Sequence, residues 1–574
     1  MTLEQGLTTG LLVALMAVFA TDRFRIELVA LLGLAAGELA GVVPMARAFS
    51  GLANPAVVTV VEILLIVQAL QASHLLDRLA EWLQRKLATP FRMTAVLCAI
   101  GAGVSTVMNN IGAFGLMLPV AYSLSRKAGL PVRQFMMPLS FATLLGGLCT
   151  LVGTPANLLI GEALHSATGT GFAFLDFAPT GLAVTAVGLA AMALWMPRAL
   201  GIGGAEEEVE AASRRRLVTE VRLPAGSPEV CAGEIAARVS GEVHGALRDG
   251  RRVFPLSRTT ALVAGDLLTV EANERALAAA LAFGLLASAR AEPGSARLEA
   301  AVMPDSTLVG SRVATAEALE ERGVRVVAVA TPNPRLEGGL DELQLGIGDV
   351  LYLEGDSDAL ADVADYTGLM PLAPPAGPVP RDVSILPVAV FAAGILLAAF
   401  NLAPPEIAFG AVVIVLAVSG ALDLRTALAE LNWPIVILLV AMLPLGEAVA
   451  TTGAAAAIAA ALTAAVPLSA LSVTATALGL AMLITPFVNN ATTAVILAPI
   501  AVELARAAGV SPALTLMAVA IGASCDFLTP FGHHNNTLAY GLGGYRFRDF
   551  LRAGWVPSAA VFVTGVLACL AVWG

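Results

Sequence analysis

Two stretches far apart in the chain decide how it folds: Gly146-Gly-Leu-Cys-Thr-Leu-Val-Gly-Thr-Pro-Ala-Asn157 and Ala523-Ser-Cys-Asp-Phe-Leu-Thr-Pro-Phe-Gly-His-His-Asn-Asn536. Each lies inside a long apolar stretch and combines glycine, threonine, proline and asparagine. Pro155 and Pro530 remove a backbone donor and disfavour helical geometry at the residue before them. Inside a membrane, the backbone leaves the helix only where it is buried in protein or lines a wet cavity. We therefore predict two broken helices around a polar site.

The rest of the sequence has the composition of an integral membrane protein. Its 574 residues are 57% hydrophobic and only 13% charged, whereas ordinary soluble domains are roughly a quarter charged. The pI near 5.1 excludes the basic surface of a nucleic-acid-binding protein. Five scattered cysteines without a CxxC pair favour neither a disulfide framework nor a zinc site. No nucleophile elbow, HExxH or kinase-type loop occurs in the sequence, so we expect neither an enzyme nor a cofactor.

Apolar stretches predict the membrane spans, and several reach the roughly 20 residues that cross a hydrocarbon core. They lie near residues 6–20, 26–42, 55–72, 135–165, 180–197, 384–402, 406–421, 434–450, 512–541 and 554–572. Two further apolar stretches, 93–125 and 468–505, are interrupted by the pairs Asn109-Asn110 and Asn489-Asn490. We predict that both are re-entrant hairpins with an asparagine pair at each tip.

Three short motifs of the first half return in the same order in the second half. Leu52-Ala-Asn-Pro55 is echoed by Leu431-Asn-Trp-Pro434 at an offset of 379, and the two asparagine pairs are 380 residues apart. Gly153-Thr154-Pro155 is echoed by Leu528-Thr529-Pro530 at an offset of 375. Because the halves begin from opposite sides of the membrane, we predict inverted repeats, the architecture of secondary transporters.

The positive charges predict the orientation. With both tips re-entrant, most lysines and arginines of the membrane segments fall on one side. By the positive-inside rule that side is cytoplasmic. We therefore expect a multi-pass protein of the cell membrane, with the N- and C-termini outside and the central segment in the cytoplasm.

The central segment, residues 201–380, carries the whole net charge of −11, because the flanking segments balance to zero. Within it Arg216–Pro224 resembles Arg297–Pro304, and the Gly265-Asp266 turn resembles Gly348-Asp349. These echoes predict two small α+β modules. The predicted boundaries are membrane repeats at 1–200 and 381–574, modules at 205–290 and 291–370, and a stiff proline-rich linker at 371–380.

The broken segments and the tips have the chemistry of a coupled transport site. Freed carbonyls, together with threonine and asparagine oxygens, form a neutral oxygen cage suited to a small cation. Half-helix N-termini at the tips offer amide donors to an anion. The structural alternative is that the asparagines only form hydrogen bonds with neighbouring helices and hold them together.

Asp526 is the candidate functional acid. His533-His534 is either a proton relay, a substrate contact, or part of a solvated end of the span.

At these motifs the sequence resembles the divalent anion/sodium symporter family of the ion transporter superfamily. It is most similar to the branch with two TrkA-C (RCK-C) domains inserted between its halves. The most specific pieces are Gly147–Asn157 and Phe527–Phe550. The resemblance implies a homodimer of scaffold and transport domains, elevator-like movement in a lipid bilayer, and an unknown small ligand of the TrkA-C-like domains.

The resemblance also implies where the coupling ion and the substrate bind. Sodium is expected between each tip and a broken helix, at Asn109, Asn110, Gly153, Thr154 and Asn157, and at Asn489, Asn490, Thr529, Gly532 and Asn535. The small anionic substrate is expected between the tips, at Asn110, Gly112, Asn490, Thr492, Pro155, Pro530 and His533.

Two departures from that family bear on the substrate. Dicarboxylate members carry Ser-Asn-Thr at the tips, whereas these tips read Asn109-Asn110-Ile111 and Asn489-Asn490-Ala491. The missing hydroxyls favour a compact oxyanion such as sulfate. His533-His534 stands where relatives commonly have Tyr-Gln, which keeps proton coupling open. We predict sodium-coupled symport of a small divalent anion. The alternatives are a proton-coupled or exporting, arsenite-like oxyanion transporter and an anion sensor without net transport.

Overall fold

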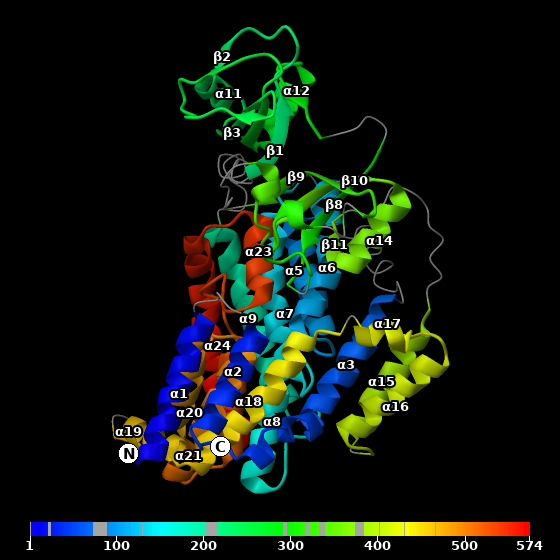
Figure 1. The fold of residues 1–574 in the computed structure, drawn as a ribbon. Coiled ribbons are helices and arrows are strands. Elements are labelled where there is room, and N and C mark those ends of the chain that lie inside the picture. Colours follow the sequence, from blue (N-terminus) through cyan, green and yellow to red (C-terminus); the bar gives the residue numbers. More distant parts are fainter. Residues whose placement is uncertain are drawn as a thin grey trace.

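The computed structural model describes most of the chain: residues 2–20, 25–72, 89–128, 130–200, 216–290, 295–304, 306–316, 319, 321–331, 339–372, 384–400, 402–429, 431–464 and 467–574. The predicted start of the central segment, at 201–215, and most of the proline-rich linker, from residue 373, lie outside these residues. The described chain forms a long helical bundle with a sheet-rich block at one end, and both termini lie at the other end (Figure 1).

The first half of the bundle contains helices with these bounds: α1 (Leu3–Ala20), α2 (Ile26–Leu39), α3 (Pro55–Ala72), α5 (Pro90–Ser105), α6 (Asn110–Ala128), α7 (Arg133–Gly146), α8 (Pro155–Thr168) and α9 (Ala178–Ala199). Three short 3₁₀ helices accompany them: η1 (Met45–Arg47), η2 (Ser50–Ala53) and η3 (Gly147–Cys149).

The second half of the bundle contains α15 (Leu386–Ala399), α16 (Pro405–Val418), α17 (Leu424–Ala429), α18 (Trp433–Thr451), α19 (Ala454–Thr463), α20 (Ala470–Ile484), α21 (Asn490–Ala508), α22 (Pro512–Ser524), α23 (His534–Gly543) and α24 (Phe547–Trp573). Within the described residues, five helical segments are long and apolar enough to cross a membrane: Met45–Leu70, Ala178–Ala199, Trp433–Thr451, Asn490–Ala508 and Phe547–Trp573.

The helical pairs and the breaks occur where the sequence predicts them. Helices α5 and α6 pack together and meet at residues 106–109, and α20 and α21 pack together and meet at 485–489. Helix α7 ends at Gly146 and α8 begins at Pro155, while α22 ends at Ser524 and α23 begins at His534. At 1.5 Å per residue, each of these four half-helices is too short to cross a hydrocarbon core of about 30 Å. We call residues 147–154 the first break and 525–533 the second break, and the meeting points of the two helical pairs, with the asparagine pairs, the first and second tips.

The two broken helices occupy the centre of the bundle. Every residue of α7 is buried, and so is α22 from Ala513 to Ser524. Helix α7 packs on α5 and α9, α22 packs on α20 and α24, and α9 packs along α24. The first break is buried throughout, and the second break is buried apart from Leu528, Thr529, His533 and the exposed Phe531. Most of their polar backbone is therefore enclosed by protein.

The sheet-rich block is built from these elements: β1 (Arg216–Arg222), β2 (Val230–Cys231), α11 (Ala232–Arg238), β3 (Glu242–Arg248), β4 (Arg251–Arg252), β5 (Ala261–Leu262), β6 (Leu267–Asn273), α12 (Glu274–Ala282), β7 (Ala287–Ser288), β8 (Ala296–Val302), η4 (Val313–Thr315), β9 (Arg325–Thr331), η5 (Leu340–Glu342), β10 (Val350–Gly355), α14 (Ser357–Thr367) and β11 (Leu369–Pro371). We call its described residues 216–290 the first module and 295–372 the second module.

The two modules share one sheet. Its main strand order is β11-β8-β10-β9-β1-β6-β3-β4, with neighbouring strands antiparallel. Strand β1 of the first module pairs with β9 of the second, from Arg216 opposite Thr331 to Thr219 opposite Ala328. Each module nevertheless has its own apolar core, one around Ile235 and one around Leu351. The modules are thus separate cores joined edge to edge.

Both predicted Gly-Asp turns are present and have the same internal geometry. Gly265 and Gly348 have φ of +94° and +84°, where glycine is strongly preferred. The carboxylate of Asp266 accepts from the amide of Val263 at 2.9 Å, and that of Asp349 accepts from Gly346 at 2.7 Å. Burial alone would raise the pKa of Asp266, but hydrogen bonds from Arg248 and the Val263 amide hold that pKa below its ordinary value.

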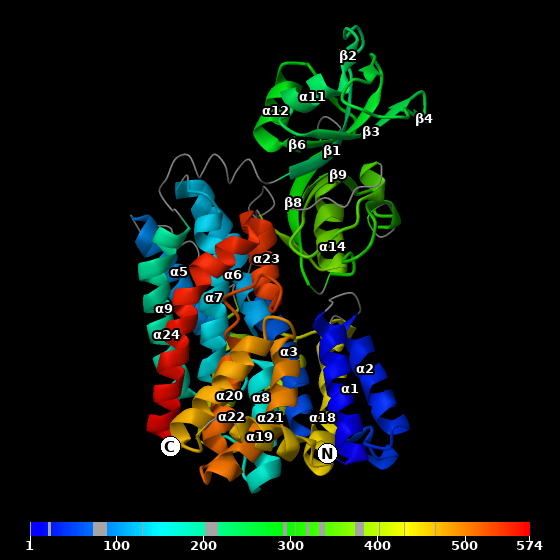
Figure 2. The ribbon, with the colours of Figure 1, turned by 90° about the vertical axis from the view of Figure 1, so that its left-hand side faces the viewer.

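The second module rests directly on the helical bundle, whereas the first module lies farther out (Figures 1 and 2). A Cβ on Gly348 would lie 3.2 Å from the carbonyl oxygen of Thr537 and 3.3 Å from the Cα of Gly541, both in α23. Arg126 at the end of α6 donates to the carboxylate of Glu299 in β8 at 2.8 Å. The block therefore contacts the two helices, α6 and α23, that begin at the first tip and the second break.

Candidate functional site

The first asparagine of each pair caps a helix. The side-chain oxygen of Asn109 accepts from the amide of Gly112 at 2.6 Å, and that of Asn489 accepts from the amide of Thr492 at 2.8 Å. In each case an N-cap side chain satisfies the amide three residues later, which is the usual way to stabilise a helix start. These two side-chain oxygens are therefore already engaged in starting α6 and α21.

The first break is held together by Asn157. Its side-chain amide donates to the carbonyl oxygens of Gly147 at 2.9 Å and Thr150 at 2.8 Å. The hydroxyl of Thr154, which is extended at φ −143°, accepts from the amide of Asn157 and caps α8. All three hydrogen bonds are local, so the residues of the break itself determine its shape.

The second break is held together in the same way by Asn536. Its side-chain amide donates to the carbonyl oxygens of Asp526 at 2.7 Å and Thr529 at 3.1 Å. The ring nitrogen Nδ1 of His533 accepts from the amide of Asn535 at 3.1 Å and caps α23.

These hydrogen bonds change the expected alignment of the halves. Asn157 and Asn536 each donate to the carbonyls ten and seven residues earlier, so they are equivalent positions at an offset of 379. The Thr-Pro echo, at an offset of 375, therefore does not mark equivalent positions. Pro155 is the first residue of α8, whereas Pro530 lies in the second break. The sequence predicts Asn535 as the site residue of this pair and does not single out its neighbour Asn536, which bridges the second break.

Each tip packs against the break of its own half. The hydroxyl of Thr150 donates to the carbonyl of Thr106, and the hydroxyl of Thr485 donates to the carbonyl of Ala523 at 2.7 Å. A Cβ on Gly532 would lie 2.6 Å from both the Thr485 carbonyl oxygen and the Cα of Pro486. Glycine at this position allows tip and break to approach this closely.

The first tip also reaches the second break, which joins the two halves. The side-chain amide of Asn535 donates to the carbonyl oxygen of Asn110 at 2.8 Å and to the hydroxyl of Thr143 at 2.9 Å. The hydroxyl of Ser140 donates to the side-chain oxygen of Asn536 at 2.7 Å. The tip of α6, the middle of α7 and the start of α23 therefore form one polar cluster.

His533 presents an N–H group to the first tip. Because its Nδ1 accepts from the Asn535 amide, the proton of a neutral ring sits on Nε2. This Nε2 lies 3.4 Å from the side-chain nitrogen of Asn110, whose side-chain oxygen accepts from Ser105 at 2.9 Å. Two donors thus face each other across the meeting point of tip and break.

Four buried side-chain oxygens at the tips and breaks have no hydrogen-bond partner among the described residues: Asn157 Oδ1, Thr492 Oγ1, Ser524 Oγ and Asn535 Oδ1. Unpartnered buried polar atoms are rare, and a bound ion is one recognised explanation for them. Helices α7 and α22 also end at the breaks, where their last carbonyls carry partial negative charge. This donor set is neutral, oxygen-only and suited to a small hard cation.

The remaining predicted site residues also line the tips and breaks. Gly153 is buried against Gly147, and a Cβ there would strike the Gly147 backbone. Asn490 is half-buried and its side-chain oxygen accepts from the amide of Ala491 at 2.9 Å. Pro155 is half-buried and Pro530 is buried. The contacts given above place Thr529, Gly532, Thr492 and Gly112 at a tip or a break as well.

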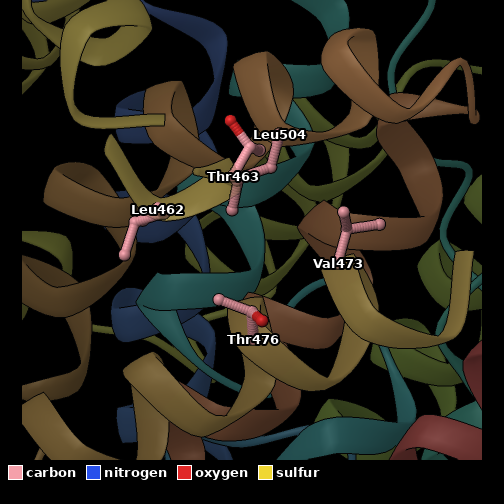
Figure 3. A pocket seen from close by; sticks show the side chains of 5 residues that line it. All are labelled: Leu462, Thr463, Val473, Thr476 and Leu504. Carbon is pink, nitrogen blue, oxygen red and sulfur yellow. The ribbon is translucent and has the colours of Figure 1, made fainter. Parts of the chain in front are cut away.

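A separate hollow lies between α19, α20 and α21 (Figure 3). It is partly open and is lined by Leu462, Thr463, Val473, Thr476 and Leu504. Leu504 is near the end of α21 that is opposite its start at Asn490. None of the predicted site residues lines this hollow, so it is distinct from the tips and breaks.

Comparison with known proteins finds transporters. The family model described as citrate transporter (CitMHS) matches residues 16–522 and 477–574. An uncharacterized transporter of Synechocystis sp. is 25% identical over 99% of this chain and 97% of its own length. A putative sulfur deprivation response regulator of Chlamydomonas reinhardtii is 28% identical over 90% of this chain and 93% of its own length. Sodium/sulfate cotransporter 2 of the same alga is 25% identical over 54% of this chain and 39% of its own length.

Proposed function

This chain belongs to the citrate transporter family, and on that premise we propose that it is a secondary transporter that couples sodium to the import of a small divalent anion. A sulfate-like oxyanion is favoured over a dicarboxylate. In this proposal the tips and breaks bind sodium and the anion, and the sheet-rich block regulates transport. The protein is not an enzyme in this proposal.

The observation that carries the anion site is the facing pair of donors on His533 and Asn110. The Nε2–H group of His533 and the side-chain N–H group of Asn110 lie 3.4 Å apart, and neither can accept a hydrogen bond from the other. An oxyanion beside both groups would accept from both. Helix α23 starts at His534 and α6 starts at Asn110, so two positive helix ends also favour negative charge there.

The cation sites rest on the unpartnered oxygens. Asn157 Oδ1 belongs to the first break, and Asn535 Oδ1 belongs to the cluster that joins the first tip to the second break. Neutral oxygens from unwound backbone and half-helix C-termini are the groups that coordinate sodium in secondary transporters. The name of the similar sodium/sulfate cotransporter agrees with sodium as the coupling ion. Asn109 and Asn489 would contribute carbonyl oxygens, because their side-chain oxygens cap helices.

The substrate proposal rests on the tips. Ile111 and Ala491 follow the asparagine pairs and offer no hydroxyl for a second carboxylate. A compact tetrahedral anion needs few donors close together, as the His533 and Asn110 side chains provide. The similar sodium/sulfate cotransporter favours sulfate, and the family description makes citrate the natural competitor to test.

We propose that the two halves are inverted repeats. The matched hydrogen bonds of Asn157 and Asn536 support this, as does the order of tip, broken helix and long last helix in each half. In this arrangement α5–α8 and α20–α23 form a moving transport domain, and a homodimer of the remaining helices forms the scaffold. The block, with TrkA-C-like modules, faces the cytoplasm, and both termini lie outside.

The sheet-rich block is placed to regulate transport. Its second module rests on α23 through Gly348 and reaches α6 through the Glu299–Arg126 ion pair. Any ligand that shifts this module therefore acts on helices that carry the proposed anion site. The first module would bind such a ligand without blocking the contact.

A second candidate function is an anion sensor without net transport. The name of the similar putative sulfur deprivation response regulator, which matches 90% of this chain, favours it. Both functions use the same anion site, and they differ only in whether the bound anion crosses the membrane.

A ligand screen tests the proposed site. Thermal unfolding of the purified full-length protein is followed with sulfate, citrate, succinate, phosphate or arsenite, each in sodium and in potassium. We expect sulfate to raise the melting temperature most, and only in sodium. Stabilisation by citrate or succinate but not sulfate contradicts the substrate class, and equal shifts in potassium contradict sodium coupling.

A further inference from the structure

A buried carboxylate occupies the second break. Asp526 follows the end of α22 by two residues, and it is 2% exposed. Its side-chain oxygens receive long hydrogen bonds, at 3.3 and 3.4 Å from the Thr529 hydroxyl and 3.5 Å from the Asn536 amide. The backbone amides of Thr529 and Leu528 also face it.

This carboxylate has no cationic partner in the described part of the chain, where none of the ion pairs includes Asp526. Buried charges in proteins are normally paired or bound to metal ions. Hydrogen bonds of 3.3 to 3.5 Å are at the weak end of the usual range. A cation bound next to Asp526 would compensate the charge of this buried carboxylate.

Oxygens converge around the carboxylate. A Cβ on Gly532 would clash with the Oδ2 of Asp526 and would lie 2.6 Å from the carbonyl oxygen of Thr485, so these two oxygens lie close to one another beside Gly532. The hydroxyl of Ser524, two residues earlier, is buried and has no partner among the described residues. Helix α22 ends at that serine, so its last carbonyls also point toward this region.

The first break has no such charge. Its position equivalent to Asp526 is Gly147, because both residues offer the carbonyl that lies ten residues before the bridging asparagine. The first break therefore contains only neutral oxygens, while the second adds a carboxylate to an otherwise matching set. The two breaks share the same hydrogen-bond pattern to their bridging asparagine, but only the second break contains a carboxylate.

We propose that Asp526 is the charged ligand of a sodium site between the second break and the second tip, with Ser524 Oγ and the Thr485 carbonyl as further ligands. The first break, with Gly147, forms the weaker, neutral site. This inference rests on the proposed sodium coupling and adds which of the two sites is charged.

Thermal unfolding of the full-length protein tests the assignment, with sodium titrated against choline at constant ionic strength. The variants are Asp526→Asn and, as a matched control, Glu503→Gln. Glu503 is also acidic and lies on α21, but it pairs with the exposed Arg506 at 2.6 Å. We expect Asp526→Asn to raise the half-saturating sodium concentration at least tenfold, and Glu503→Gln to leave it unchanged.

The sodium-free melting temperature separates a ligand from a structural carboxylate. If Asp526 is a cation ligand that has no partner in the absence of sodium, Asp526→Asn should melt no lower than wild type in choline, because the substitution removes an unpaired buried charge. A lower melting temperature with an unchanged sodium response would overturn the assignment.

Ser524→Ala provides a second variant if Asp526→Asn does not fold. We expect it to weaken the sodium response several-fold, and a wild-type response contradicts the site. A wild-type protein that does not respond to sodium at all contradicts the sodium coupling itself. A sodium response in wild type that survives unchanged in Asp526→Asn contradicts only the role of Asp526.

Discussion

The side-chain amides of Asn157 and Asn536 make the same pair of hydrogen bonds in the two halves of the protein, each to the carbonyls ten and seven residues before it. The two asparagines are fully buried. Each therefore holds a non-helical segment in a defined loop. The resulting pair of loops is the framework on which the proposed transport site depends.

Replacing either bridging asparagine should open its loop. Asn157→Ala or Asn536→Ala leaves two buried carbonyls without donors, at about 1–3 kcal/mol for each. We expect a clearly lower melting temperature and loss of sodium-dependent stabilisation. Asn432→Ala is the control, because Asn432 only caps α18, and losing a cap costs about 1 kcal/mol. Bridging variants no less stable than this control would contradict the role assigned to the loops.

The capping asparagines at the tips should tolerate a different cap. Asn489→Ser keeps a side-chain oxygen for the Thr492 amide, whereas Asn489→Ala removes it. We expect the alanine variant to be about 0.5–2 kcal/mol less stable and the serine variant to match wild type in both melting temperature and sodium response. The same comparison applies to Asn109 and the Gly112 amide. If the serine variants lose sodium binding but not stability, the asparagine side chains themselves are ligands.

Much of the bundle was predictable from local sequence, because prolines and caps act locally. Pro155 and Thr154 predict the start of α8, and the asparagine pairs predict the starts of α6 and α21. The exact alignment of the second break was not predictable in this way. Pro530 lies within that break, so the Thr-Pro motif pointed to an offset of 375. The choice between Asn535 and Asn536 depends on which side chain points back into its own loop, which only the folded backbone determines.

Variants of His533 distinguish the roles of its two ring nitrogens. His533→Asn keeps an acceptor that can cap α23 in place of Nδ1, but it loses the Nε2–H group that faces Asn110. We expect this variant to fold with a melting temperature near wild type, to bind sulfate at least tenfold more weakly and to keep its sodium response. His533→Ala should lose stability as well, because the cap is removed. Unchanged sulfate binding by His533→Asn would exclude the imidazole from the anion site.

The two Gly-Asp turns offer a matched test of docking. Gly348→Ala and Gly265→Ala impose similar strain at positive φ, but only Gly348 touches the bundle. In the described structure no atom lies within 4 Å of a Cβ on Gly265. We expect Gly348→Ala to speed hydrogen exchange in α23 and to change the transport rate at least threefold, while Gly265→Ala does neither. Equal effects of the two variants would mean that docking does not couple the block to the site.

The contact of the second module with α23 has no signal in the sequence. The repeat of the Gly-Asp turn predicts two similar modules, and the turns are indeed alike. Gly348 and Gly541 contact each other only because the two backbones meet in space, 193 residues apart. The pairing of β1 with β9, which merges the modules into one sheet, depends likewise on long-range association that neither strand's residues specify.

Uptake of labelled sulfate into proteoliposomes tests the central claim most directly. The purified full-length protein is reconstituted, and an inward sodium gradient is compared with an inward potassium gradient and with a pH gradient, alongside the Asn110→Ala variant. We predict accumulation driven by sodium alone and abolished in the variant. Binding of sulfate without accumulation would favour the sensor. Accumulation driven equally by potassium, or only by the pH gradient, would contradict sodium-coupled transport through the two tips and breaks.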